Sequence, residues 1–249
     1  MDLIVASRQL VPEWMDQPDL DARLHRQALL ALDRINSVSL TAGQIWREMM
    51  KRLAWGKSGP RARQIAEPAE YSVLDVACGS GGLLLDLWKR AARAGVRLRL
   101  AGCDISGTAL AVARQQAETR NTKVDFQQID VTEEPFARQY DFVISSLFLH
   151  HLSDEQAAAL LRRMADAARL AVIITDLRRS RLGYYYAWLG TRLLCRSAVA
   201  QIDGPRSVAR AFTMEEVQRL AEQAGLTSAT VQRSWPQRFI LRWWRLGDG

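Results

Sequence analysis

The sequence predicts an α/β protein built on a doubly wound sheet of seven strands, and three observations lead to this fold class. From Tyr71 onward, short apolar runs alternate with amphipathic helical patterns, and parallel strands need helix-length connections of this kind. Two more strand-like runs lie on either side of Pro236, and so short a separation allows only an antiparallel hairpin. With 249 residues, the chain is long enough for one large domain with a cap.

The elements of the core follow from the period of their apolar residues. Runs of strand length predict strands over residues 71–77, 97–103, 123–129, 140–146, 170–175, 227–233 and 237–245. Helical patterns predict helices over residues 82–94, 106–119, 153–168 and 213–225. The third of these helices begins with a capping box of Ser153 and Gln156, in which each side chain satisfies a backbone N–H group. Strict alternation of strand and helix predicts helices on both faces of the sheet.

A helical cap and a linker are predicted ahead of this core. Residues 1–56 contain two amphipathic helical stretches, each with apolar residues along one face. Residues 57–70 contain a glycine and two prolines, which are typical of a linker. Residues 71–249 then form the main domain.

Composition limits the classes of function. The net charge of +7 comes from basic residues spread as singles and pairs, which indicates a solvated surface and argues against nucleic acid as a partner. Cys78, Cys103 and Cys195 show no CxxC spacing, so neither a disulfide framework nor a metal site is expected. The first residues lack the basic and long apolar regions of a signal peptide. We therefore expect a reduced, cytoplasmic protein that holds no metal.

The stretch SVLDVACGSGG at residues 72–82 places a carboxylate, Asp75, just ahead of a glycine-rich loop. A dinucleotide fingerprint would need a third glycine where this chain has Leu84, and a phosphate-binding P-loop would need Gly-Lys-Ser or Gly-Lys-Thr. A carboxylate facing the site also disfavours an anion. The loop therefore predicts a ligand with a positive charge or hydroxyl donors.

Two more aspartates, Asp104 and Asp130, come at the ends of the second and third predicted strands. A carboxylate at the first position can bind a ribose diol, and one at the second can accept a hydrogen bond from an exocyclic amine. Each alone has a structural explanation as a helix cap or a surface acid. In a doubly wound sheet, however, ligands bind outside the carboxyl ends of the strands, so the three aspartates predict one site.

The motifs VLDVACGSG, GCDIS, QQIDV and YDFVISSLFLHHL, in this order and spacing, resemble those of the class I S-adenosylmethionine-dependent methyltransferases. The resemblance implies a Rossmann-like sheet and S-adenosylmethionine as cofactor, with the loop glycines near the cofactor, Asp104 on its ribose and Asp130 on its adenine. Ala77 stands where the family often has the first glycine. The implied cofactor-binding residues are Asp75, Ala77, Gly79, Gly81, Asp104, Ile105, Asp130, Val131 and Ser146, with Ser145 an alternative to Ser146.

His150 and His151 follow the fourth predicted strand, where an acceptor would lie in this family. A histidine with a pKa near 6.5 can take a proton from a phenol or enol at neutral pH, so we expect one of the pair to be the catalytic base. The alternative is that they cap and pack the following helix. His25, in the cap, is expected to be structural.

Residues 178–212 are predicted to be a helical insertion after the fifth strand, rich in aromatic and aliphatic residues with arginines around them. Such a segment suits a lid over a small apolar acceptor or a region that touches a membrane, and a buried packing helix is the structural alternative. Methyltransferases of nucleobase amines usually have a D-P-P-Y type motif after the fourth strand, whereas residues 145–148 of this chain read SSLF. Methylation of base amines is therefore disfavoured. Within the family the chain looks most like bacterial methyltransferases of phenolic, quinone or polyketide acceptors. Oxygen or carbon methylation is expected, and an RNA methyltransferase or a non-catalytic SAM-binding module is the alternative.

Overall fold

The computed structural model describes residues 7–16, 21, 23–24, 26–30, 40–57, 70–194 and 197–245. His25, Cys195 and most of the predicted linker at 57–70 lie outside these residues. The strands are β1 (Glu70–Val76), β2 (Arg97–Asp104), β3 (Val124–Gln128), β4 (Tyr140–Ser146), β5 (Ala168–Leu177), β6 (Thr230–Ser234) and β7 (Arg238–Trp244). The helices are η1 (Trp14–Asp16), α3 (Thr41–Lys57), α4 (Gly82–Arg93), α5 (Gly107–Thr119), η3 (Leu149–His151), α6 (Asp154–Ala167), α7 (Arg181–Leu194), α8 (Ala198–Arg210) and α9 (Met214–Gln223).

One seven-stranded sheet has the order β3-β2-β1-β4-β5-β7-β6. The first five strands are parallel, whereas β7 pairs antiparallel with both β5 and β6. The chain reverses its strand order after β3, because β1 has β2 on one side and β4 on the other. The predicted fold class, with its terminal hairpin, is confirmed.

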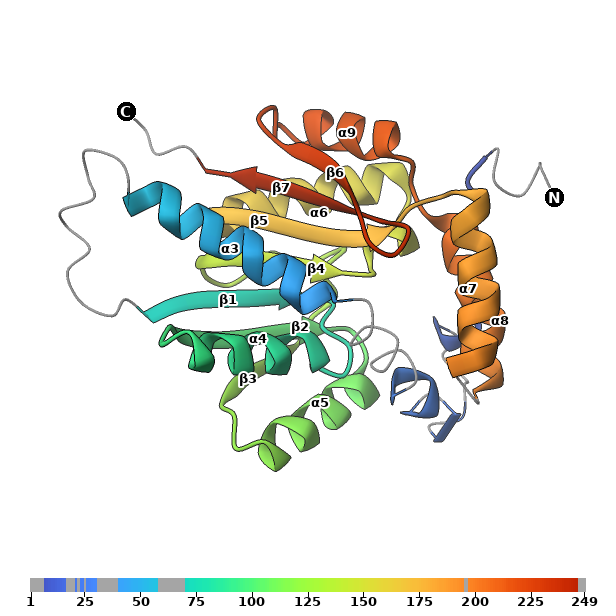
Figure 1. Ribbon diagram of the computed structural model, residues 1–249, viewed down its shortest axis with the longest axis horizontal. Helices are drawn as coiled ribbons and strands as arrows, with labels where there is room; N and C mark the ends of the chain where they lie inside the picture. The colour runs from blue at the N-terminus through green and yellow to red at the C-terminus, as the bar shows by residue number, and fades with distance from the viewer. Residues whose placement is uncertain are drawn as a thin grey trace.

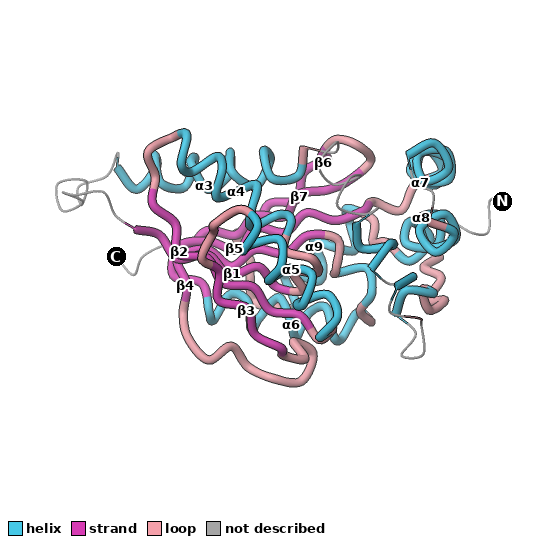
Figure 2. The backbone as a smooth tube through the Cα atoms, turned by 90° about the horizontal axis from the view of Figure 1, so that it is seen from below, coloured by secondary structure: helices cyan, strands magenta, loops and turns pink. Residues whose placement is uncertain are grey.

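Helices cover both faces of the sheet (Figures 1 and 2). On one face, Ile45 and Met49 of α3 and Leu84 of α4 pack in one apolar cluster with Val73 and Phe142. On the other face, buried residues of α6 and α9 pack against alternate residues of the same strands, since successive side chains of a strand point to opposite faces. Both α6 and α9 begin with capping boxes, Ser153 with Gln156 and Thr213 with Glu216.

The second of the predicted cap helices, α3, lies on the sheet and not apart from it. Its apolar stripe contributes Ile45 and Met49, which are fully buried, and the helix contacts α4, β4 and β5. The division of the chain into cap, linker and main domain stays a prediction, but the structure makes α3 part of the core.

The helices α7 and α8 stand beyond the carboxyl ends of the parallel strands, away from both helical layers (Figure 1). They pack on each other, and α8 also contacts η1 and η3. These two helices occupy the predicted insertion at 178–212. Among the described helices, none is both long and apolar enough to cross a membrane.

Candidate functional site

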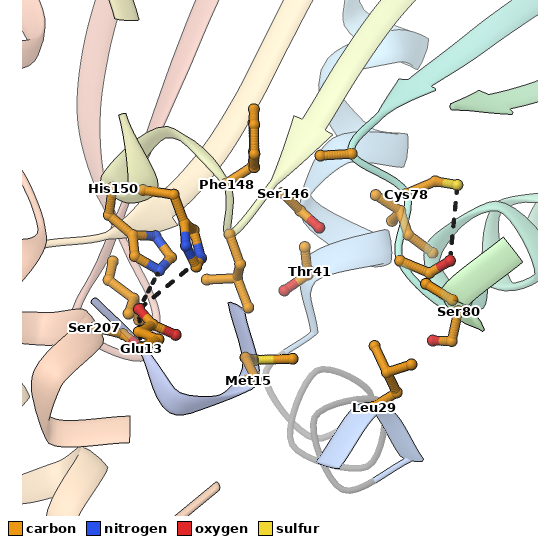
Figure 3. Close-up of a pocket in the computed structure, with 18 of the residues that line it drawn as sticks. Glu13, Met15, Leu29, Thr41, Cys78, Ser80, Ser146, Phe148, His150 and Ser207 are labelled. Carbon is orange, nitrogen blue, oxygen red and sulfur yellow. Dashed lines mark hydrogen bonds and ion pairs between the residues drawn. The ribbon is translucent and has the colours of Figure 1, made fainter. Parts of the chain in front are cut away.

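A cavity of about 1210 Å³ lies at the carboxyl edge of the sheet. The glycine-rich loop and the end of β2 form one wall, and η3, α7, α8 and the amino-terminal segment around Glu13 form the other. Figure 3 shows Cys78 and Ser80 of the loop on one side and Glu13, His150 and Ser207 on the other. The site therefore lies where the order of the strands reverses, as ligand sites in open α/β sheets do.

The loop after β1 follows a left-handed path, with φ of 56° at Ala77, 53° at Gly79 and 76° at Gly81. A Cβ on Gly79 would meet nothing within 4 Å, so this backbone is open to the cavity. A Cβ on Gly81 would lie 3.1 Å from the ring of Phe126, so Gly81 serves close packing of the loop, and its neighbours line the cavity. Ala77 adopts a conformation that costs a residue with a side chain about 1–2 kcal/mol.

Asp104 fastens this loop to the end of β2. Its Oδ2 accepts a hydrogen bond from the Gly79 backbone N at 2.8 Å, and its Oδ1 accepts one from the Ser106 N at 2.8 Å. A carboxylate oxygen has two lone pairs and can accept more than one hydrogen bond. Asp104 lines the cavity, where the carboxylate is placed to meet a diol.

The other predicted cofactor residues line the same wall of the cavity: Ile105, Asp130, Val131 and Ser146. Ile105 is 62% exposed, which is unusual for a large apolar side chain and leaves it free to pack on a flat ligand. The Asp130 carboxylate accepts from the N and Oγ1 of Thr132 at 2.9 and 2.6 Å, and these bonds lower its pKa. Ser145 is buried and donates to the Val76 carbonyl, so Ser146 is the serine that lines the cavity.

Asp75 lies beneath the loop and does not line the cavity. It is 1% exposed, and its Oδ1 has no hydrogen-bond partner among the described residues. Burial raises the pKa of Asp75 well above its ordinary value, and the charge of Asp104 raises it further. The side chain expected to face the ligand is therefore a buried acid beneath the loop, because its position on β1 directs it into the core.

His150 is buried between two carboxylates. Its Nδ1 lies 2.7 Å from Asp176 Oδ1, and its Nε2 lies 3.5 Å from Glu13 Oε1. Burial alone would lower the pKa of His150, but the charges and hydrogen bonds of Asp176 and Glu13 outweigh it and raise the pKa to about 10. In this arrangement His150 carries a proton on both nitrogens near neutral pH. Its role as a base stays a prediction, which this environment does not favour.

The Glu13 carboxylate, which belongs to the amino-terminal segment, lies close to both histidines. His151 Nε2 lies 3.9 Å from Glu13 Oε1, and the Ser207 hydroxyl donates to the same oxygen at 2.8 Å. Burial alone would raise the pKa of Glu13, but His150, His151 and Ser207 hold it at about 2. Sequence reasoning missed Glu13, because it precedes the core motifs and no local pattern marks it.

The aromatic face of α7 mostly points away from the cavity. The residues of α7 that line it are Gly183, Tyr186, Ala187, Gly190 and Thr191. Tyr185, Trp188 and Leu193 are 52%, 44% and 73% exposed. The insertion lines the cavity with small residues and one tyrosine where an aromatic lining was expected, and its role as a lid stays a prediction.

The parallel sheet with an antiparallel β7, its glycine loop after β1 and acidic residues at the ends of β2 and β3 define the class I methyltransferase fold. A family model described as a methyltransferase domain matches residues 73–170. This match and the fold support a class I S-adenosylmethionine-dependent methyltransferase, the class that the motifs predicted.

Named relatives agree with this assignment. The chain is 29% identical over 165 residues to a ubiquinone biosynthesis O-methyltransferase of Thiobacillus denitrificans, over 64% of this chain and 65% of the relative. It is 34% identical over 110 residues to a demethylmenaquinone methyltransferase of Thermus thermophilus, over 43% of this chain and 48% of the relative. The chain thus covers less than two thirds of the length of either relative.

Solved structures share the fold at low sequence identity. The plantazolicin methyltransferase BamL, in complex with a triazolic desmethylPZN analog and SAH, has a TM-score of 0.62 at 16% identity, over 88% of this chain and 90% of that one. The magnesium protoporphyrin IX methyltransferase of Synechocystis with bound SAM has a TM-score of 0.52 at 16% identity, over 94% and 88%. At these identities, the likeness concerns the fold alone.

Proposed function

We propose that this protein transfers a methyl group from S-adenosylmethionine to an oxygen or carbon of a small hydrophobic acceptor of the phenol or quinol type. The observation that carries the proposal is the single cavity in which the glycine loop and Asp104 lie on one wall and the histidine pair and the α7–α8 lid on the other. A cofactor and an acceptor bound in such a cavity face each other. The relatives named for ubiquinone biosynthesis and demethylmenaquinone support the choice of acceptor.

The residues of the loop wall fit the cofactor. The open backbone at Gly79 leaves space that a Cβ would fill, Asp104 offers acceptor oxygens for ribose hydroxyls, and the exposed Ile105 offers an apolar surface for adenine. When bound, S-adenosylmethionine supplies a methyl group already activated by its sulfonium. The protein then needs mainly to align the acceptor with that methyl group and exclude water.

We expect residues of the opposite wall to hold the acceptor. Ala187 and Gly190 leave room for an apolar body beside α7. The polar groups of Glu13 and His150 lie on the opposite side of the cavity from the glycine loop (Figure 3), with the ring of His151 4.3 Å from that of His150. A few polar groups in a mostly apolar pocket orient a ligand through its hydroxyl groups.

A filled pocket tests the acceptor assignment. A Cβ on Gly190 would meet nothing within 4 Å, so Gly190→Leu places a side chain in the cavity without a clash in the helix. If the acceptor occupies this space, the leucine side chain overpacks the complex with the acceptor, which costs about 1–3 kcal/mol. We therefore expect kcat/KM for a prenylated catechol or naphthoquinol to fall roughly 5- to 150-fold, with unchanged S-adenosylmethionine affinity. Leu193→Ala, on the exposed side of the same helix, is the matched control and should retain wild-type kcat/KM.

The assay uses isotopically labelled S-adenosylmethionine with phenols, quinols and a total RNA sample. Labelled small acceptor and unlabelled RNA are expected. Labelled RNA with no labelled small molecule would assign the protein to RNA methylation. Binding of S-adenosylmethionine without transfer to any acceptor would indicate a binding module. Equal effects of Gly190→Leu and Leu193→Ala on kcat/KM would show that the acceptor does not bind beside α7.

A further inference from the structure

Three metal-ligating side chains converge at the acceptor end of the cavity. Glu13, His150 and His151 each offer one ligand atom, and these atoms all lie within 4.8 Å of one another. They come from two distant parts of the chain, the amino-terminal segment and η3, and Figure 3 shows the polar atoms of Glu13 and His150 directed toward each other. Glu13 and His150 are 2% exposed, and all three residues line the cavity.

The two buried residues are held in the orientation that a metal site requires. The Asp176 carboxylate lies 2.7 Å from Nδ1 of His150, which leaves Nε2 directed at Glu13. A carboxylate on the far nitrogen of a ligating histidine is the usual outer-shell arrangement, since it fixes the tautomer and raises the basicity of the ligand. The Ser207 hydroxyl holds Glu13 in place from α8.

The distances fit a small cation after a modest contraction. Zinc–ligand bonds of about 2.0–2.1 Å in tetrahedral geometry place neighbouring ligand atoms about 3.3 Å apart. Nε2 of His150 lies 3.5 Å from Glu13 Oε1 and Nε2 of His151 lies 3.9 Å from it. Side-chain rotations that shorten these two distances by about 0.2 and 0.6 Å, and that bring the third pair of ligand atoms from within 4.8 Å to the same spacing, would close the site.

We propose that Glu13, His150 and His151 bind a divalent transition-metal cation of the zinc type at the acceptor end of the cavity. The cation takes the place of the proton on Nε2 of His150, which is released to solvent, since a histidine must be deprotonated at the ligating nitrogen. Two imidazoles and one carboxylate suit zinc, cobalt or iron better than magnesium or calcium, which prefer all-oxygen sites. The dipositive charge balances the two carboxylates, Glu13 and Asp176, buried around His150. A three-residue site keeps a further coordination position open toward the cavity, where water or an acceptor oxygen can bind.

Cobalt binding tests the site without any methylation assay. The full-length protein, treated with a chelator and then freed of it, is titrated with Co²⁺, whose visible absorption is strong in tetrahedral sites, and Zn²⁺ is then added as competitor. We expect one equivalent of Co²⁺ with a tetrahedral spectrum, displaced by one equivalent of Zn²⁺. Glu13→Gln and His151→Gln should each weaken binding at least tenfold, whereas His25→Gln and the exposed Glu118→Gln should not.

Two results would overturn the proposal. One is the absence of a tetrahedral cobalt spectrum and of stoichiometric zinc binding in the wild type, which would mean that His150 simply bridges the two carboxylates as a buried cation. The other is equal affinity in Glu13→Gln, His151→Gln and the controls. Circular dichroism of each variant identifies any that fails to fold, and because no donor or acceptor is present, either failure leaves the proposed methyl transfer untouched.

Discussion

Replacing Asp104 tests the cofactor wall of the cavity, because one carboxylate has two tasks there. Its oxygens accept from the backbone N–H groups of Gly79 and Ser106 at 2.8 Å each, and we expect them also to accept from the ribose hydroxyls of S-adenosylmethionine. Asp104→Ala removes both sets of bonds. Asp104→Asn keeps one acceptor oxygen but turns an amide donor toward the other N–H group.

The size of the effect follows from these bonds. Hydrogen bonds to a charged group contribute about 1.5–3 kcal/mol each, but Asp104 is half-buried, so water partly replaces the lost partner. We therefore expect Asp104→Ala to weaken S-adenosylmethionine binding by about 1–3 kcal/mol, roughly a 5- to 150-fold increase in Kd. Asp104→Asn should fall between this variant and the wild type. The loop bonds exist without cofactor, so the melting temperature of the unliganded Asp104→Ala variant should fall as well.

Isothermal titration calorimetry with S-adenosylhomocysteine measures the affinity, and circular dichroism reports the fold and the melting temperature. The exposed Asp166→Asn, on α6, is the matched control and should bind like the wild type. A folded Asp104→Ala variant with unchanged affinity would refute the ribose assignment. Weakened binding with an unchanged melting temperature would instead refute the fastening of the loop by Asp104.

Three further predictions concern the same loop and its surroundings. Ala77→Gly should raise the free energy of unfolding by about 0.5–1 kcal/mol, because it relieves a left-handed φ at some entropic cost. The control Ala111→Gly, at an exposed position of α5, should lower the free energy of unfolding by about 1 kcal/mol in the same denaturant titration. A lower free energy of unfolding in both variants would contradict the prediction for Ala77. The pKa of Asp75 is raised in the folded state, so its contribution to stability is greatest below the ordinary aspartate pKa of about 3.9 and declines as the pH rises above it. Asp75→Asn should therefore raise the melting temperature at pH 8 more than at pH 4.5, and an equal gain at both would show that Asp75 does not titrate abnormally. NADH should show no measurable binding by calorimetry, since the buried Leu84 stands where a dinucleotide fold needs glycine, and tight NADH binding would reverse the assignment of the cofactor.

The core could be predicted from the sequence because its signals are local. The capping boxes at Ser153 and Thr213 predicted the first residues of α6 and α9 to within one residue. The short connection at Pro236 allowed only antiparallel pairing of the last two strands. The positions of Asp104 and Asp130 followed from one rule, that parallel strands end at the same edge. Each of these inferences needed only neighbouring residues and the direction of a strand.

What the sequence could not reveal depends on contacts between distant segments. The stripe of Ile45 and Met49 shows that α3 has an apolar face but not that this face lies on the sheet. Asp75 has a strand neighbour on each side, and only the packed sheet shows that its carboxyl group is enclosed. Glu13 carries no motif, and its meeting with His150 depends on how the amino-terminal segment crosses α8.

The placement of α7 and α8 away from both helical layers has a consequence for how such an enzyme changes over generations. The residues proposed to bind the cofactor lie in the stretch from β1 to the end of β4, whereas the opposite wall of the cavity comes from η3, from α7 and α8 after β5, and from the amino-terminal segment. Substitutions in that stretch can reshape the acceptor pocket while the sheet and the glycine loop stay as they are. New acceptors are therefore accessible to this scaffold through mutations that leave the stability of its core and its affinity for the methyl donor nearly constant.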